Sequence, residues 1–147
     1  MYSNGIQDYR RTSVVTADPK RLVLMCYEGV MDNLNLVKQK LIERDYEAKG
    51  RAFTKAQDII NELLCSLDFE KGGSIAKNLD SIYNYMLRRI IHADVNKDLS
   101  ALNEVIGMLN ELKTAWEKVF YNKDTEIEPD LAGFNEERRQ AAVYGSV

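Results

Sequence analysis

The spacing of apolar residues is the feature that most constrains the fold of this chain. In four successive stretches of the 147 residues, apolar side chains recur at intervals of three and four. This is the period of an amphipathic α-helix and differs from the alternation of a β-strand. The stretches cover about residues 19–43, 47–67, 75–94 and 99–121. Each has roughly 20 residues, or about 30 Å of helix. The sequence therefore predicts an all-α protein with four long helices.

Short joints separate these stretches, at residues 44–46, at the Gly72-Gly73 pair and at residues 95–98. Joints of this length place successive helices antiparallel, so we expect an up-down four-helix bundle over residues 18–121. Glycine accepts the left-handed backbone conformation that ends a helix. One apolar pattern runs up to the double glycine and another begins directly after it. Gly72 and Gly73 are therefore predicted to form a structural corner where the second helix ends.

Two segments lie outside the predicted bundle. Residues 1–17 carry Tyr2, Ile6 and Tyr9 at helical spacing, on a segment too short to be a stable helix alone, so we expect an N-terminal cap that docks on a surface. Residues 122–147 hold six acidic and three basic residues and are predicted to form a mobile acidic tail. The rest of the chain carries 17 acidic and 17 basic residues. A neutral body predicts no binding of nucleic acid.

The side chains that catalysis and metal binding require are scarce. His92 is the only histidine, and Arg89 stands three residues before it, where a di-metal helical bundle needs glutamate. Cys26 and Cys65 lie on or beside apolar stripes and are predicted to be reduced and buried. The glycine pair lacks the lysine and hydroxyl residues of a phosphate-binding loop. We therefore expect neither enzymatic activity nor a bound metal or cofactor.

The chain also lacks the patterns that direct a protein into or across a membrane. No apolar run reaches the length of a membrane-spanning helix, and residues 1–5 lack the charge and the apolar stretch of a signal peptide. These observations predict a cytosolic protein without membrane insertion.

Apolar residues exceed what a single core stripe needs. In residues 19–43 we expect Leu22, Cys26 and Val30 to begin the core stripe, with Leu24 and Tyr27 beside it. The third stretch carries a second series at spacings of four, formed by Tyr83, Leu87 and Ile91. Such series suit either a broad core face or surface grooves that accept an amphipathic helix. Spacing alone leaves both alternatives open.

Several motifs, spread in order over about residues 1–120, resemble those of the FliS-type flagellin export chaperones. Glu28 stands where that family usually has aspartate, and the resemblance ends before the tail. The matching segments are Met1-Tyr2 with Ile6 and Tyr9, Leu22 to Gly29, Glu70-Lys71-Gly72-Gly73 with Ile75-Ala76 and Asn78-Leu79, Tyr83-x-Tyr85-Met86-x-Arg88-Arg89, and Leu109 to Trp116.

The resemblance implies a cytosolic chaperone with the fold of a four-helix bundle, no enzymatic activity and no cofactor. Such a protein binds the disordered C-terminal segment of flagellin, prevents premature polymerisation and delivers flagellin to the export gate of the flagellar type III secretion apparatus. It also implies that Tyr2, Ile6 and Tyr9 plug the client groove when it is empty or dock to the export-gate protein. The residues expected to contact the client are Leu22, Met25, Tyr83, Leu87 and Ile91.

Other functions remain open from the sequence. The first alternative is a regulatory adaptor that sequesters a flagellar regulator on the same apolar grooves. A structural bundle that assembles with itself is the second. For the chaperone, a homodimer is possible when no client is bound. An enzyme is the least favoured reading, because the residues that would carry its chemistry are missing.

Overall fold

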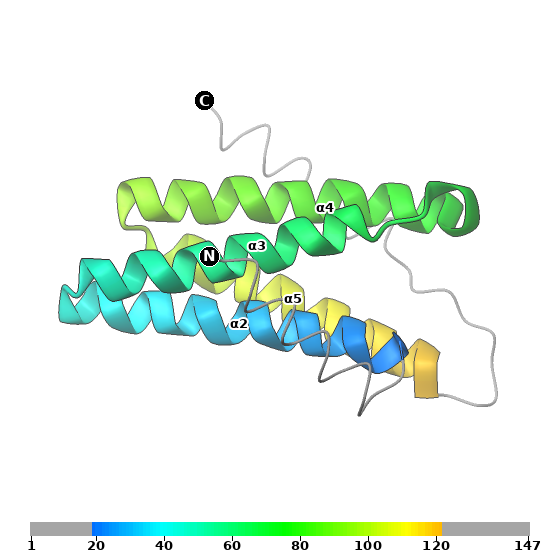
Figure 1. Ribbon diagram of the computed structural model, residues 1–147, viewed down its shortest axis with the longest axis horizontal. Coiled ribbons are helices and arrows are strands. Elements are labelled where there is room, and N and C mark those ends of the chain that lie inside the picture. The colour runs from blue at the N-terminus through cyan, green and yellow to red at the C-terminus, as the bar shows by residue number, and fades with distance from the viewer. Residues whose placement is uncertain (1–18, 122–147) are drawn as a thin grey trace.

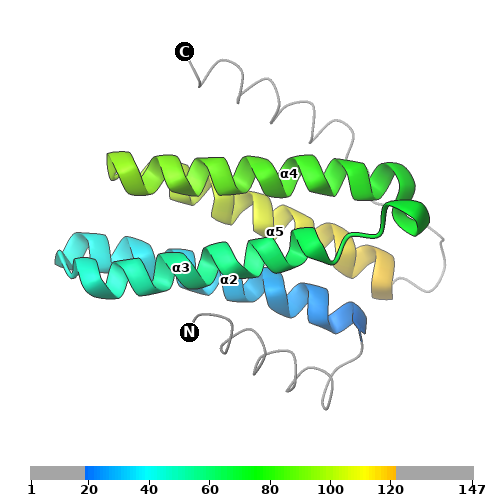
Figure 2. The same cartoon turned by 45° about the horizontal axis from the view of Figure 1, so that its top comes forward.

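A computed structural model describes residues 19–121 as an antiparallel four-helix bundle, which confirms the predicted all-α fold (Figure 1). Each helix contacts the next one along the chain, and the last contacts the first. The contact is most extensive between the first two helices and least extensive between the second and third, where the ribbons are also seen to diverge (Figure 2). The helices are α2 (Pro19–Glu43), α3 (Tyr46–Cys65), α4 (Phe69–Asn96) and α5 (Leu99–Tyr121).

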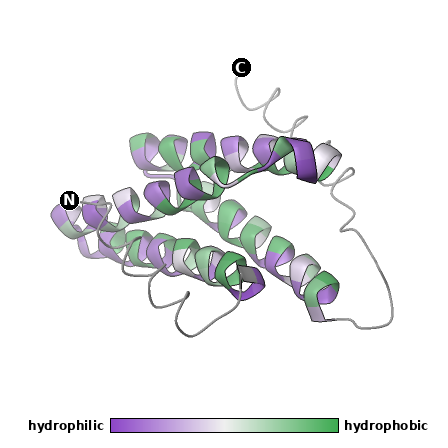
Figure 3. Ribbon diagram, turned by 45° about the vertical axis from the view of Figure 1, so that its right-hand side comes forward, coloured by the Kyte–Doolittle hydropathy of each residue, from purple (hydrophilic) through white to green (hydrophobic). Residues whose placement is uncertain are grey.

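One continuous apolar core runs along the inside of the bundle. Every helix contributes a buried stripe, and polar and apolar segments alternate along each ribbon, as amphipathic helices require (Figure 3). The largest fully buried side chains are those of Tyr27, Leu24, Leu34, Ile60, Ile82, Met86, Ile90, Leu102, Met108, Leu109 and Leu112.

The first turns of α2 bury a different stripe from the predicted one. Leu24 and Tyr27 are 1% and 0% exposed, whereas Leu22 and Cys26 are only half-buried. The two candidate stripes lie on neighbouring faces of the same helix. The buried one is fixed by Tyr27, whose hydroxyl finds partners inside the bundle. The prediction that Cys65 is buried is also wrong, because this free cysteine near the end of α3 is exposed.

The short polar joints supply side-chain caps for the helices that begin after them. Asp45 accepts a hydrogen bond from the Ala48 amide at the start of α3, and Asp68 accepts from the amides of Glu70 and Lys71 at the start of α4. These carboxylates satisfy amide groups that have no partner within the helix. The α4–α5 joint turns at Lys97, whose φ of 53° places it in the left-handed region.

The glycine corner differs from the prediction. Helix α3 already ends at Cys65, and Asp68 starts the next helical segment before the glycines. The glycines therefore make a kink near the beginning of α4 rather than the end of α3. Gly73 has φ 53° and ψ −127°, a conformation that only glycine adopts readily. Gly72 does not have a positive φ; its constraint is space, because a Cβ there would lie 2.8 Å from the Ala76 Cβ.

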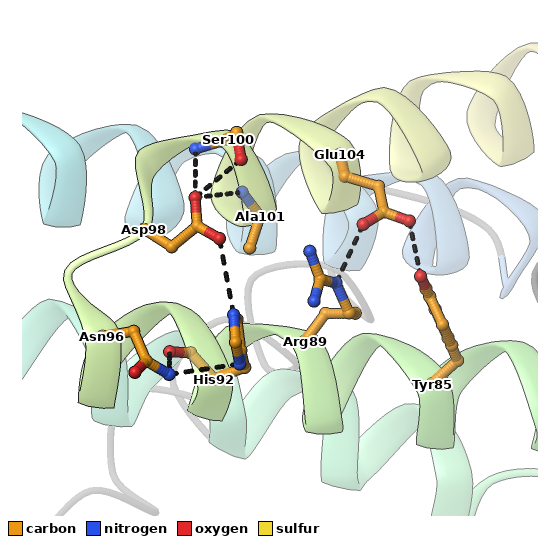
Figure 4. A network of polar contacts seen from close by, with 8 residues as sticks. All are labelled: Tyr85, Arg89, His92, Asn96, Asp98, Ser100, Ala101 and Glu104. Atoms are coloured by element: carbon orange, nitrogen blue, oxygen red, sulfur yellow. Dashed lines mark hydrogen bonds and ion pairs between the residues drawn. The ribbon is translucent and has the colours of Figure 1, made fainter. Parts of the chain in front are cut away.

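Polar contacts fix the register of α4 against α5 (Figure 4). The Glu104 carboxylate on α5 accepts hydrogen bonds from the Tyr85 hydroxyl at 2.6 Å and from Arg89 Nε at 2.9 Å. At the joint, Asp98 Oδ1 accepts from the Ser100 amide at 3.0 Å, while its Oδ2 lies 3.4 Å from His92 Nε2. The single histidine thus supports the start of α5 rather than a catalytic centre.

None of the helices within residues 19–121 combines the length and the apolar character that crossing a bilayer requires. The proposed cap at residues 1–17, with Tyr2, Ile6 and Tyr9, and the tail at residues 122–147 lie outside the described residues.

Candidate functional site

Two of the predicted client-contacting residues lie on one exposed face of α4. Ile91 is 45% exposed, and Leu87 is half-buried against the core one turn earlier. Val95 continues the series one turn later and is 74% exposed. The sequence analysis missed Val95 because it assigned residue 95 to the joint, whereas α4 continues to Asn96. We call Leu87, Ile91 and Val95 the α4 strip.

Leu87 and Ile91 lie on the side of α4 that faces α3, whereas Val95 points farther outward. Asp94 Oδ1 accepts a hydrogen bond from Lys49 Nζ of α3 at 2.5 Å, and at about 100° per residue Leu87 and Ile91 lie within about 60° of Asp94 around the helix. Lys97 Nζ at the end of α4 lies 5.0 Å from the centroid of the Tyr46 ring, which is 49% exposed. The start of α3 and the end of α4 are therefore in contact at this end of the bundle.

Two further predicted contact residues lie on α2. Leu22 and Met25 are half-buried, and Leu36, 39% exposed, lies further along the same face. We call Leu22, Met25 and Leu36 the α2 strip. Ion pairing between Glu28 and Lys113 at 3.1 Å marks the side of α2 that faces α5. At about 100° per residue, Met25 and Leu36 lie about 60° and 80° from Glu28, so the α2 strip lies beside that side, on the outer face of α2.

The two strips are separated by the outer face of α3, which is polar. Arg51 and Glu47 form an exposed ion pair on this face at 3.0 Å, and Lys55 and Asn61 are exposed farther along the helix. The structure therefore divides the predicted contact residues between two places rather than gathering them in one groove. A single bound chain that contacts both strips has to be extended, because the strips lie on different helices.

Tyr83, for which the spacing leaves both a core and a groove position open, belongs to the core, because its side chain is 2% exposed. Its hydroxyl lies 2.7 Å from the Tyr27 hydroxyl, which also accepts a hydrogen bond from Trp116 Nε1 at 3.1 Å. The two tyrosine rings meet edge to face, with centroids 6.3 Å apart. Burial raises the pKa of both phenols. The sequence contained the signal, since Tyr83 has core spacing from Leu79, Met86 and Ile90.

The described part of the chain contains no cluster of three or more histidine, cysteine, aspartate or glutamate side chains arranged to hold a metal ion. Arg89 is paired with Glu104, and Arg88 lies 6.0 Å from the Tyr85 ring, so the two arginines are used in different ways. What this surface offers is exposed apolar area on a rigid frame, which suits the binding of another polypeptide.

Comparison with known proteins gives one consistent result. Residues 2–123 match the family model described as "Flagellar protein FliS". The chain is 39% identical over 125 residues to the flagellar secretion chaperone FliS of Salmonella typhimurium (strain LT2), covering 81% of this chain and 93% of that protein. It is 35% identical to the chaperone of the same name from Vibrio cholerae, covering 78% and 88%, and 32% identical to that of Bacillus subtilis (strain 168), covering 82% and 89%.

Proposed function

Because the chain belongs to the FliS family of flagellar secretion chaperones, we propose that its client is flagellin and that it holds the C-terminal segment of flagellin on its outer surface. This family consists of chaperones and not of enzymes. In this proposal the bound segment is kept from polymerising early and is carried through the cytoplasm to the export gate. No cofactor takes part, so release follows from competition for the client at the gate.

The α4 strip is the observation that supports this proposal most directly. Ile91 and Val95 are large apolar side chains that the fold leaves 45% and 74% exposed on a helix with a well-packed inner face. An amphipathic helix of the client gains free energy by covering them, at about 25 cal/mol for each Å² of apolar area removed from water. We propose that Leu22 and Met25 of the α2 strip contact a second part of the same client.

Tyr83 has a different place in this proposal. Its ring lies inside the bundle, so direct contact with a client would require an opening of the core. We propose that it supports the surface from beneath. The hydrogen bond to Tyr27 ties α4 to α2, the two helices that carry the strips.

The test compares two exposed isoleucines. Ile91→Asp introduces a charge into the proposed interface, and we expect at least a tenfold weaker affinity for a peptide of the last forty or so residues of flagellin, measured by isothermal titration calorimetry. Ile42→Asp is the matched control, because Ile42 is 71% exposed near the end of α2 and belongs to neither strip. Equal affinities for the two variants would contradict the proposed interface. A gain of helical circular dichroism on binding is expected for the unsubstituted protein.

A second proposal concerns the N-terminal segment. We propose that Ile6 and Tyr9 dock to the export-gate protein and that Tyr2, Ile6 and Tyr9 together cover the client surface when it is empty. The double variant Ile6→Ala/Tyr9→Ala should retain flagellin in a pull-down and lose the gate protein. Normal recovery of the gate protein would refute the docking role, whereas loss of both partners would indicate damage to the fold.

A further inference from the structure

The α4 strip continues into a basic stripe. Lys77, Arg88 and Val95 are spaced eleven and seven residues apart, which places them on one outward line of the helix beside Ile91. Among residues 19–121, no carboxylate forms an ion pair with Lys77 or Arg88. The outer face of α4 therefore presents exposed apolar groups together with unneutralised positive charge. This combination complements an acidic segment with an apolar helical face.

The chain itself contains such a segment. Residues 124–147 follow the part that matches the family model, so they do not belong to the elements that the family shares. Leu131, Phe134 and Ala141 have the spacing of one helical face. Four acidic residues precede this face at positions 124, 126, 128 and 130, whereas residues 131–144 carry two acidic and two basic residues. The tail therefore joins an acidic stretch at residues 124–130 to the apolar spacing of residues 131–144, and the two together complement the basic and apolar groups on the outer face of α4.

The length of the tail allows it to reach this face. Helix α5 runs antiparallel to α4 with Glu104 beside Tyr85 and Arg89, so Tyr121 is level with the start of α4. From there to Ile91 is roughly 20 residues of helix, or about 30 Å. Residues 122–130, extended at about 3.3 Å per residue, also span about 30 Å. A fully extended connection therefore brings Leu131 to about the level of Ile91 along the bundle axis.

We propose that residues 131–144 dock on the α4 strip of the same molecule and compete for it with the client and with the N-terminal segment. The competition with the client rests on the proposed function. The docking itself rests only on the α4 surface and the sequence of the tail. A tethered segment has an effective concentration in the millimolar range. A docking affinity of about 0.1 mM would then lower the apparent client affinity about tenfold. The tail thereby makes client binding weaker and more readily reversible.

The experiment uses the full chain with Leu131→Asp/Phe134→Asp. Its matched control is Thr125→Asp/Gln140→Asp, which adds the same charge to the tail away from the apolar face. We expect the methyl resonances of Ile91 and Val95, measured by NMR, to shift in the first variant and not in the control. We also expect the first variant to bind the flagellin peptide about tenfold more tightly. Lys77→Glu/Arg88→Glu should reproduce the methyl shifts, because it removes the charge that attracts the tail.

The outcomes separate this inference from the proposed function. Unchanged methyl resonances in the first variant overturn the docking of the tail, whatever the client affinity is. Shifts that depend on protein concentration overturn it as well, because they indicate the tail of a second copy. Shifts that are independent of concentration support the docking. If these are accompanied by an unchanged client affinity, the tail occupies the α4 strip but the client does not.

Discussion

At the scale of single residues, the three side chains of Tyr27, Tyr83 and Trp116 show how a polar group is accommodated in an apolar core. The Trp116 Nε1–H group donates to the Tyr27 oxygen, and the two phenols share a further hydrogen bond. Tyr27 is thus the central member, because both of the other groups have it as their partner. Removing a partner from a buried polar group costs more than the hydrogen bond itself contributes.

This asymmetry predicts different costs for two substitutions that each delete one hydroxyl. Tyr27→Phe leaves both Trp116 Nε1 and the Tyr83 hydroxyl without their partner, so we expect it to lower the free energy of unfolding by about 2–3 kcal/mol. Tyr83→Phe keeps the Trp116–Tyr27 hydrogen bond and should lower the free energy of unfolding by only about 1 kcal/mol. Urea denaturation followed by the fluorescence of the single tryptophan measures both values. A larger loss for Tyr83→Phe would contradict the arrangement.

At the scale of elements, the bounds of a helix could be predicted where the spacing of apolar residues alone determines them. The bounds expected for α2 and α5 agree with the structure. The end of α3 and the start of α4 were not predicted, because the apolar pattern continues through Leu67 while the backbone follows the cap at Asp68. A side-chain cap satisfies free amide groups and thus outweighs the propensity of the flanking residues to continue a helix.

The candidate site was predictable in part for the same reason. Spacing identified Leu87 and Ile91 as a series outside the main core stripe; Ile91 is exposed and Leu87 is half-buried. It placed Tyr83 in the same series, although this residue equally fits the core. Spacing gives the angle around a helix, but the neighbours decide how wide the buried sector is. On α4 that sector extends to Tyr83, since its hydroxyl meets Tyr27 across the core.

The kink of α4 gives a prediction for two glycines in helical surroundings. Gly73→Ala places a side chain on a backbone with φ 53° and ψ −127°, so we expect the free energy of unfolding to fall by about 1–3 kcal/mol. Gly107→Ala is the control, for which we expect a change in the opposite direction. A Cβ at this position meets nothing within 4 Å, so the free energy of unfolding should rise by about 0.5–1 kcal/mol. Thermal denaturation compares the two. A stabilised Gly73→Ala variant would show that the kink does not require glycine.

At the scale of the whole molecule, the buried tyrosines couple folding to alkaline pH. Burial raises the pKa of Tyr27 and Tyr83 above the usual value of about 10, so the folded state keeps both protons where the unfolded chain loses them. Their contribution to stability is complete below about pH 10 and is lost as the pH rises above it. Each tyrosine should remove about 1.4 kcal/mol from the free energy of unfolding between pH 9 and pH 11.

Tyr83→Phe isolates this effect from all other groups that titrate in the same range. Lysines and exposed tyrosines contribute equally to the protein and the variant, so they cancel when the two are compared. The fall in unfolding free energy between pH 9 and pH 11, measured with urea, should be about 1.4 kcal/mol smaller in the variant, because one buried phenol is gone. Equal falls would mean that Tyr83 ionises as readily in the folded bundle as in the unfolded chain. That result would contradict the burial of the Tyr83 hydroxyl between α2 and α4.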